Sequence, residues 1–194
     1  MIEALSVYLL AGGESSRMGL DKGLIELHGK PIIGYIIDAV KQLTNDITII
    51  TSNDNYKQFK LPIIEDVYKN MGPASGIDTA LHDAKNEWVF ITSCDMPFID
   101  AMSTKHLVTL CQHHEITLAK NKHQIEPMFA CYKKSCKDKW RSMLLQNNYK
   151  LSDFINQFDT NFVHADEFLG VNPRLFLNIN TPLDLQKANA WMNK

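Results

Sequence analysis

Residues 7–22, VYLLAGGESSRMGLDK, decide the fold prediction for this chain. The apolar run 7–10 has the length of a short buried strand, and the small residues Ala11, Gly12 and Gly13 that follow it are typical of a turn. A strand that ends in a glycine-rich turn is a common opening of nucleotide-binding α/β units. The segment therefore predicts that the chain opens with a buried strand and that a loop lies at its carboxyl end.

The loop after this strand has the composition of a phosphate site. Gly12, Gly13 and Gly19 let backbone N–H groups approach a polyphosphate that a Cβ atom would hold off. Arg17 and Lys22 add positive charge, and cations aimed at a leaving pyrophosphate stabilise the transition state of nucleotidyl transfer more than the ground state. Glycines after a strand also occur in ordinary turns, and the loop matches neither the Walker pattern nor G-x-G-x-x-G. We expect a phosphate-binding loop of another type, with Arg17 and Lys22 as catalytic residues.

Strand-like and helix-like segments alternate beyond this loop. Apolar residues at helical spacing predict an amphipathic helix with Pro31 as its first residue and another after Gly72. The predicted strands of the first half are residues 47–51, 61–64 and 88–92. Such β-α-β units favour right-handed crossovers, a parallel sheet and ligands at the carboxyl ends of the strands. A helix capped by Ser103 and extending through Cys111 follows, and after it come two candidate strands, 116–119 and 124–132. The second half is therefore expected to be mixed.

The composition favours a globular protein and argues against several kinds of partner. With 194 residues, 45% of them hydrophobic, the chain can bury a core and suits a single domain over residues 1–194. A formal net charge of -2 without a run of like charges argues against binding to nucleic acid or to an anionic membrane. The apolar stretch 5–11 is too short to span a bilayer, and Glu3 lies where a signal peptide carries basic residues. We expect a cytoplasmic protein.

The cysteine and histidine patterns predict no zinc site. The four cysteines form no C-x-x-C pair. The run His113–His114–Glu115 lacks the i, i+4 histidines of a zinc-binding helix. We therefore expect reduced thiols.

Polar residues follow two of the predicted strands and are candidates for metal or nucleotide contacts. Asp95 follows the strand 88–92 at the sheet edge where bound phosphates lie, and one carboxylate together with substrate phosphates is enough to hold Mg²⁺. Asn53 follows the strand 47–51, where its amide can contact the base or the ribose. Turn formation is an ordinary alternative role for both residues.

The C-terminal segment offers a second metal contact. Asn178 and Asn180 are predicted on one face of a last strand, from which both side chains can reach a metal or a phosphate. The alternative is a polar edge strand that leads into Thr181, which forms a capping box with Asp184 at the start of the last helix. We take Asn180 as the candidate second metal ligand.

Residues 10–22, LAGGESSRMGLDK, followed by Gly29–Lys30–Pro31, resemble the signature of the molybdenum cofactor guanylyltransferases in residue type and in spacing. Further segments fit this family in order along almost the whole chain: residues 72–76 (GPASG), 94–97 (CDMP), 127–132 (PMFACY) and 178–184 (NINTPLD). The resemblance implies an α/β fold, a Rossmann-like three-layer α/β/α sandwich with a mostly parallel, partly mixed sheet.

The resemblance also implies an activity and a nucleotide site. The activity is the Mg²⁺-dependent transfer of GMP from GTP to molybdenum-molybdopterin, with release of pyrophosphate. The family's GTP contacts correspond to Leu10, Ala11, Gly12 and Lys22 in this sequence, and Arg17 matches the family's loop arginine.

Guanine selectivity and the remaining nucleotide contacts follow from the same resemblance. The pair Gly12–Gly13 is associated with guanine, whereas related cytidylyltransferases tend to carry Ala-Gly, so GTP is favoured over CTP. Asp66 resembles the aspartate that contacts the guanine nucleotide, with a solvated loop acid as the alternative. Asp95 resembles the aspartate that holds Mg²⁺ beside the GTP.

The acceptor side departs from the family pattern. The family places the pterin over residues 127–132 and 148–153 and commonly shows glycine and a basic pair in the second segment, whereas this chain has NNYK at residues 147–150. No nucleophile–base pair is required, because the acceptor is already a phosphate anion, so we expect a direct in-line displacement. Transient contacts with molybdoenzymes or other cofactor-biosynthesis proteins are a further expectation.

Two alternatives stay open. The same loop serves transfer from CTP to molybdopterin, or from a nucleoside triphosphate to a sugar or alditol phosphate, and a GTP-versus-CTP competition assay separates these cases. A non-catalytic GTP-binding adaptor that delivers cofactor would need a damaged site, whereas Arg17, Lys22 and Asp95 are all present. Release of pyrophosphate would eliminate the adaptor.

Overall fold

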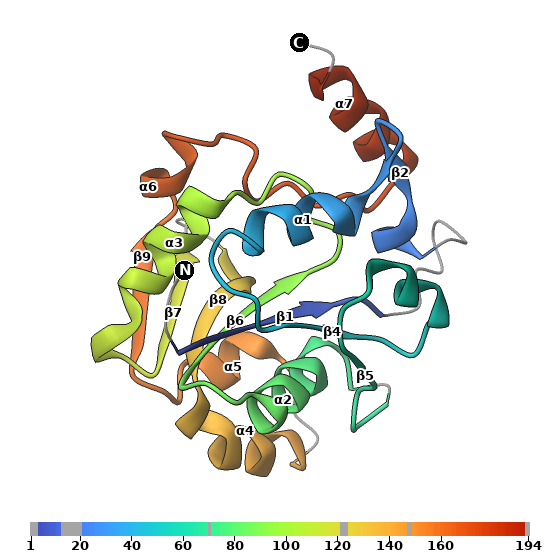
Figure 1. Cartoon of the computed structure of the whole chain (residues 1–194). Coiled ribbons are helices and arrows are strands. Elements are labelled where there is room, and N and C mark those ends of the chain that lie inside the picture. The colour runs from blue at the N-terminus through green and yellow to red at the C-terminus, as the bar shows by residue number, and fades with distance from the viewer. Residues whose placement is uncertain (1–3, 13–20, 70, 121–123, 147–148, 193–194) are drawn as a thin grey trace.

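The computed structural model describes residues 4–12, 21–69, 71–120, 124–146 and 149–192. It has a seven-stranded sheet with the order β5-β4-β1-β6-β8-β7-β9 (Figure 1). The strands are β1 (Leu5–Leu10), β4 (Ile47–Ile50), β5 (Ile63–Ile64), β6 (Trp88–Ser93), β7 (Ile116–Lys120), β8 (Ile125–Lys133) and β9 (Thr160–His164). Only β8 runs antiparallel to its neighbours, β6 and β7, so the expected mostly parallel, partly mixed sheet is confirmed.

Helices cover both faces of this sheet and make three layers. One face carries α1 (Ile32–Val40) and α3 (Ala101–Thr109), and the other carries α2 (Pro73–Asp83), α4 (Lys137–Leu144) and α5 (Leu151–Ile155) (Figure 1). The remaining elements are α6 (Asp166–Leu169), α7 (Pro182–Met192), the 3-10 turns η1 (Lys22–Leu24), η2 (Asp54–Phe59), η3 (Cys111–His113) and η4 (Lys134–Cys136), and a hairpin of β2 (Glu26–Leu27) and β3 (Lys30–Pro31). No helix in these ranges is long and apolar enough to cross a membrane.

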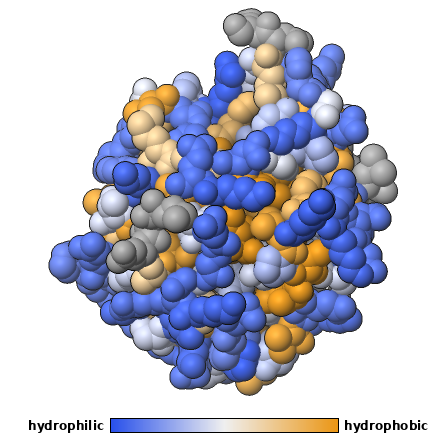
Figure 2. Space-filling model, in the orientation of Figure 1, coloured by the Kyte–Doolittle hydropathy of each residue, from blue (hydrophilic) through white to orange (hydrophobic). Residues whose placement is uncertain are grey.

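The central strands are apolar on both faces because both are covered. In β1, Val7 and Leu9 pack in the cluster under α1 and α3, whereas Tyr8 packs in the cluster under α2 and α4. The period of two along a strand produces this division, and each fully buried large side chain contributes about 1.5–3 kcal/mol. Hydrophilic side chains cover most of the face seen in Figure 2, with an apolar area in its middle and to its right. The core therefore lies in two layers, one on each side of the sheet.

Several predicted boundaries are corrected by the structure. Pro31 belongs to β3 and precedes α1 rather than starting it. Helix α3 is capped by Asp100, whose carboxylate accepts a hydrogen bond from Ser103 N at 2.7 Å, so Ser103 is not the cap. The prediction favoured Ser103 because either residue type caps helices, and only the backbone decides which one lies outside the helix. The helix also ends at Thr109, before Cys111.

The segment around Asn178 and Asn180 is not a strand, which corrects the last strand prediction. Its backbone is irregular and is tied to the sheet edge by one hydrogen bond, from Ile179 N to Asp95 O at 2.9 Å. Sheet pairing at the far edge is made instead by β9, which the sequence did not suggest. The capping box of Thr181 with Asp184 is confirmed: Thr181 N donates to Asp184 Oδ2 at 2.9 Å, and Asp184 N donates to Thr181 Oγ1 at 3.2 Å.

Candidate functional site

The candidate site lies at the carboxyl ends of β1 and β6. Backbone hydrogen bonds join the end of β1 to both neighbouring strands. Cys94 N, just after β6, donates to Leu10 O at 3.0 Å, and Ala11 N donates to Ile50 O of β4 at 2.9 Å. Gly12 follows on an open part of the surface, since a Cβ atom added there would meet nothing within 4 Å. The edge therefore has a rigid floor with free space above Gly12, as a phosphate-binding loop requires.

Three predicted side chains meet at this edge. Lys22 Nζ lies 3.3 Å from Asp95 Oδ2 and donates a hydrogen bond to Asn180 Oδ1. Ser93 Oγ donates to the other carboxylate oxygen of Asp95. The side chains of Lys22 and Asp95 are 26% and 15% exposed, so the pair is accessible to a ligand but partly shielded from water. The fold thus brings together a cation, a carboxylate and an amide from three distant segments.

The capping box holds Asn180 in place. Asn180 N and Thr181 N both donate to Asp184 Oδ2, at 3.2 and 2.9 Å. Hydrogen bonds, the largest effect coming from the Thr181 side chain, keep the pKa of Asp184 below its usual value. A carboxylate that stays ionised keeps these bonds at neutral pH, so the turn that presents Asn180 stays fixed.

Asp21 positions Lys22, and the sequence analysis did not identify it. Its carboxylate caps η1 by accepting a hydrogen bond from Gly23 N at 3.2 Å, and it also accepts from Asn53 Nδ2 at 3.0 Å and from the Tyr56 hydroxyl. Burial raises the pKa of Tyr56, so its hydroxyl remains a donor. Asn53 is predicted to contact the nucleotide; in this structure its side-chain amide nitrogen donates a hydrogen bond to Asp21. A capping aspartate directly before Lys22 is the signal that sequence analysis could have used.

Close packing around Gly23 leaves no room for a larger residue. A Cβ atom added to Gly23 would overlap the Tyr56 hydroxyl and lie 3.0 Å from Cys94 Cβ. Burial raises the pKa of Cys94 to about 12, so this thiol is neutral and serves as a packing residue. All four cysteines are buried and free, as expected of reduced thiols.

Asp66 lies at the start of α2, away from the Lys22–Asp95 pair. Its carboxylate accepts hydrogen bonds from Ser75 Oγ, from Thr79 Oγ1 at 3.1 Å and from Tyr68 N at 3.4 Å. Within the part of the chain that the structure describes, no hydrogen bond or ion pair joins Asp66 to Lys22 or Asp95. Asp66 therefore organises the beginning of α2.

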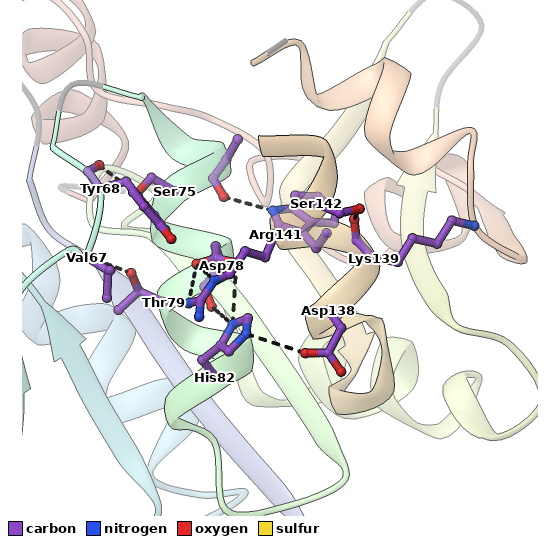
Figure 3. Close-up of polar contacts among 12 residues, drawn as sticks. Val67, Tyr68, Ser75, Asp78, Thr79, His82, Asp138, Lys139, Arg141 and Ser142 are labelled. Atoms are coloured by element: carbon purple, nitrogen blue, oxygen red, sulfur yellow. Dashed lines mark hydrogen bonds and ion pairs between the residues drawn. The ribbon is translucent and has the colours of Figure 1, made fainter. Parts of the chain in front are cut away.

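A buried ion pair joins α2 to α4 (Figure 3). The fully buried side chain of Asp78 accepts hydrogen bonds from Arg141 Nη2 at 2.8 Å and from Arg141 Nε at 3.2 and 3.3 Å. The hydrogen bond with Asp78 raises the pKa of Arg141. His82 Nδ1 lies 3.4 Å from Asp78 Oδ1, and the guanidinium lies over the Tyr68 ring at 5.6 Å. No local pattern of residues predicted this pair.

The comparison with known families fits this geometry. Residues 7–161 match the MobA-like NTP transferase domain. The chain belongs to this family. A probable molybdenum cofactor guanylyltransferase of Carboxydothermus hydrogenoformans is 32% identical over 188 residues, covering 96% of this chain and 95% of the relative. A molybdenum cofactor guanylyltransferase of Yersinia pestis strain Pestoides F is 35% identical over 191 residues, covering 96% and 94%.

A solved structure shows that this MobA-like NTP transferase shares its fold with a more distant protein. The crystal structure of molybdopterin-guanine dinucleotide biosynthesis protein A from Archaeoglobus fulgidus superposes with a TM-score of 0.83 at 22% sequence identity, covering 97% of this chain and 98% of that one. The three-layer α/β fold is therefore confirmed, and membership of the family makes this chain a nucleotidyltransferase.

The site of this NTP transferase has the donor set of a Mg²⁺ site that substrate completes. Among the described residues, no group of three or more histidine, cysteine, aspartate or glutamate side chains can hold a metal by itself. Asp95 Oδ2 and Asn180 Oδ1 nevertheless converge on one cation, the Lys22 ammonium. Hard oxygen donors of this kind suit Mg²⁺, which takes one or two protein ligands and completes its shell with phosphates and water. The residues present therefore fit Mg²⁺ bound together with a nucleotide.

Three predicted loop residues of this NTP transferase, Gly13, Arg17 and Gly19, lie outside the described residues. Of the others, Leu10, Ala11 and Gly12 form the floor of the site. Their roles, like those of Lys22 and Asp95, are taken up as proposals below.

Proposed function

We propose that this nucleotidyltransferase moves GMP from GTP onto the phosphate of molybdenum-molybdopterin and releases pyrophosphate. The meeting of Lys22, Asp95 and Asn180 beside the loop that follows β1 is the observation that carries this proposal. Relatives named molybdenum cofactor guanylyltransferase, 31–35% identical over nearly the whole chain, support the choice of base and acceptor.

Binding of the triphosphate is assigned to the loop. The space where a Cβ atom of Gly12 would lie is open, so phosphates can approach the backbone there, and we assign Gly13 and Arg17 to the same contact. Lys22 Nζ, held near its place by the Asp21 cap, then neutralises charge that develops on the leaving pyrophosphate. The loop therefore contributes more to the transition state than to GTP binding alone.

The chemical step requires that the two substrates be aligned, but it requires no general base. A phosphate oxygen of the acceptor attacks the α-phosphorus, the bond from that phosphorus to the bridging oxygen breaks, and pyrophosphate leaves with the electron pair. Because the attacking oxygen is already anionic, no proton has to be removed, and positioning with charge neutralisation accounts for the rate. The buried Cys94 thiol takes no part, in keeping with its raised pKa of about 12.

Asp95 and Asn180 are the proposed Mg²⁺ ligands of this chain. When bound, Mg²⁺ supplies positive charge at the α-phosphate. Ser93 Oγ, which donates to Asp95 Oδ1, orients the carboxylate so that Oδ2 faces the site. The capping box fixes Asn180 in the same way. Both ligands are thus held by neighbours before any metal arrives.

The remaining assignments concern the base and the division of the chain. We assign guanine selection to Gly12 and Gly13, and nucleotide contacts to Asn53 and Asp66 after they exchange their present hydrogen bonds. The sheet order supports this, because β4 and β5, which precede Asn53 and Asp66, lie on the same side of β1.

The continuous seven-stranded sheet also supports treating residues 1–194 as one domain with a nucleotide-binding first half and an acceptor-binding second half.

The test incubates the protein with molybdenum-molybdopterin, Mg²⁺ and either GTP or CTP, and follows pyrophosphate and the dinucleotide. Product from GTP alone, lost in Asp95→Ala but retained in the surface control Asp54→Ala, is the expected result; the control side chain is 83% exposed. Preference for CTP would overturn the base assignment. GTP binding without turnover of either nucleotide would make the adaptor the better description.

A further inference from the structure

Strand β8 carries a large irregularity next to the site. Its pairing with β7 runs from Leu118↔Ala130 to Lys120↔Ile125, so residues 126–129 of β8 lie opposite the single residue Ala119. Its pairing with β6 reaches only Thr92↔Phe129, so the start of β8 continues past β6 towards the edge where Asp95 lies. Bulges of this kind often re-aim side chains beside functional sites.

The bulge is held by interactions of its own. Pro127 has no N–H group and so cannot donate a hydrogen bond to a neighbouring strand. Its carbonyl accepts a hydrogen bond from the Tyr132 hydroxyl at 2.8 Å, and Tyr132 is completely buried. Tyr132 therefore holds the backbone at Pro127, between Glu126 and Met128, from within the core.

Glu126 lies in this bulge among residues that pack onto the core. Ile125 and Met128 on either side pack against the cluster that contains Trp140 and Phe154. Burial raises the pKa of Glu126 to about 7. Across residues 4–12, 21–69, 71–120, 124–146 and 149–192, no hydrogen bond or ion pair is made by its carboxylate. A partly buried carboxylate without a partner destabilises the fold, so its presence is explained by a ligand and not by folding.

The chemistry of a carboxylate defines that ligand. Two oxygen acceptors fit two adjacent N–H donors, such as the ring N–H and the exocyclic amine of a 2-amino-4-oxopyrimidine. Guanine and pterin share this edge. The sheet order distinguishes a guanine site from a pterin site. The loop after β1 and the strands β4 and β5, to which the GTP contacts are assigned, lie on one side of β6, and β8 lies on the other. The acceptor, and not GTP, therefore faces β8.

We propose that Glu126 recognises the pterin ring of the acceptor, by accepting hydrogen bonds from the two N–H groups of its 2-amino-4-oxopyrimidine edge. This inference rests on the proposed function. Glu126 is a specificity residue for the acceptor: it does not touch the reacting phosphates, and it sets which ring system is held beside Asp95.

The test measures equilibrium binding of metal-free molybdopterin without GTP, and separately of GTP with Mg²⁺, to wild type and Glu126→Gln. Glutamine keeps the shape of the side chain but loses the charge and one acceptor, so molybdopterin binding should weaken about 10- to 100-fold while GTP binding changes less than about 2-fold. In turnover, the KM for molybdopterin should rise and the KM for GTP should not. The matched control is Glu87→Gln, which removes a glutamate paired with Lys133 at the opposite edge of the sheet and should change neither affinity.

Each other outcome has a defined meaning. Unchanged molybdopterin binding by Glu126→Gln, with normal turnover by wild type, would overturn this inference alone. Weaker GTP binding with intact molybdopterin binding would overturn it in favour of guanine recognition. Loss of both affinities together with a lower free energy of unfolding would show a structural role and overturn it as well. If wild type itself neither bound molybdopterin nor made the dinucleotide, the proposed function would fall first and this inference with it.

Discussion

The buried pair of Asp78 with Arg141 gives a stability prediction that can be worked out from the contacts. Arg141→Met removes three hydrogen-bond contacts to Asp78, at 2.8, 3.2 and 3.3 Å, and leaves a carboxylate with 0% exposure. Removing one partner of a fully buried pair costs about 3–5 kcal/mol. Because Arg141 is 31% exposed, water can reach the carboxylate once the guanidinium is gone, so we expect a loss of about 2–4 kcal/mol in the free energy of unfolding.

The assay is urea unfolding followed by the fluorescence of Trp140, which lies in the same α2–α4 interface and donates from Nε1 to Ala74 O at 2.9 Å. The double variant Arg141→Met, Asp78→Asn should recover about half or more of the loss, because no buried charge remains. A loss below about 0.5 kcal/mol, or a double variant as unstable as the single effects added, would refute this account.

Three further predictions concern the site and its surroundings. Lys22→Ala should weaken GTP binding about 10-fold or more while leaving the midpoint of urea unfolding unchanged, because the ammonium is a ligand of phosphate and its pair with Asp95 is partly exposed; equal GTP affinity by calorimetry would contradict this. Gly23→Ala should lower the free energy of unfolding by about 1–3 kcal/mol, because the new Cβ overlaps the Tyr56 hydroxyl, and a neutral effect in thermal unfolding would disprove the close packing. Burial raises the pKa of Glu126 from 4.5 to about 7, so this carboxyl binds more protons in the folded state than in the unfolded state in this interval. Its contribution to the free energy of unfolding is therefore greatest below pH 4.5, falls as the pH rises to about 7 and is constant above it. Glu126→Gln should remove this slope, and a parallel slope in both proteins would show that another group causes it.

The local patterns were sufficient for the strand–loop–helix alternation of the first half. The apolar run of β1 and the helical spacing after Pro31 are short-range features, and the structure confirms the strand and the helix that they predict. The rule that ligands lie at the carboxyl ends of parallel strands then placed Asp95 at the correct edge. The errors concerned boundaries, such as the cap at Asp100, the irregular segment before α7, and strand β9, which was not predicted.

The sequence alone determined the α/β class and the position of a candidate phosphate loop at the end of β1, because periodicity and glycine placement act within a few residues of one another. Tertiary structure alone decided that Lys22 meets Asp95 and Asn180, which are 73 and 158 residues away along the chain. It also decided the burial of Asp78 against Arg141, the support of Asp21 by Asn53 and Tyr56, and the partial burial of Glu126, whose carboxylate has no partner among the described residues. These contacts join residues that are far apart along the chain and meet only when the sheet and the helices pack together. A local pattern of residue types therefore cannot predict them.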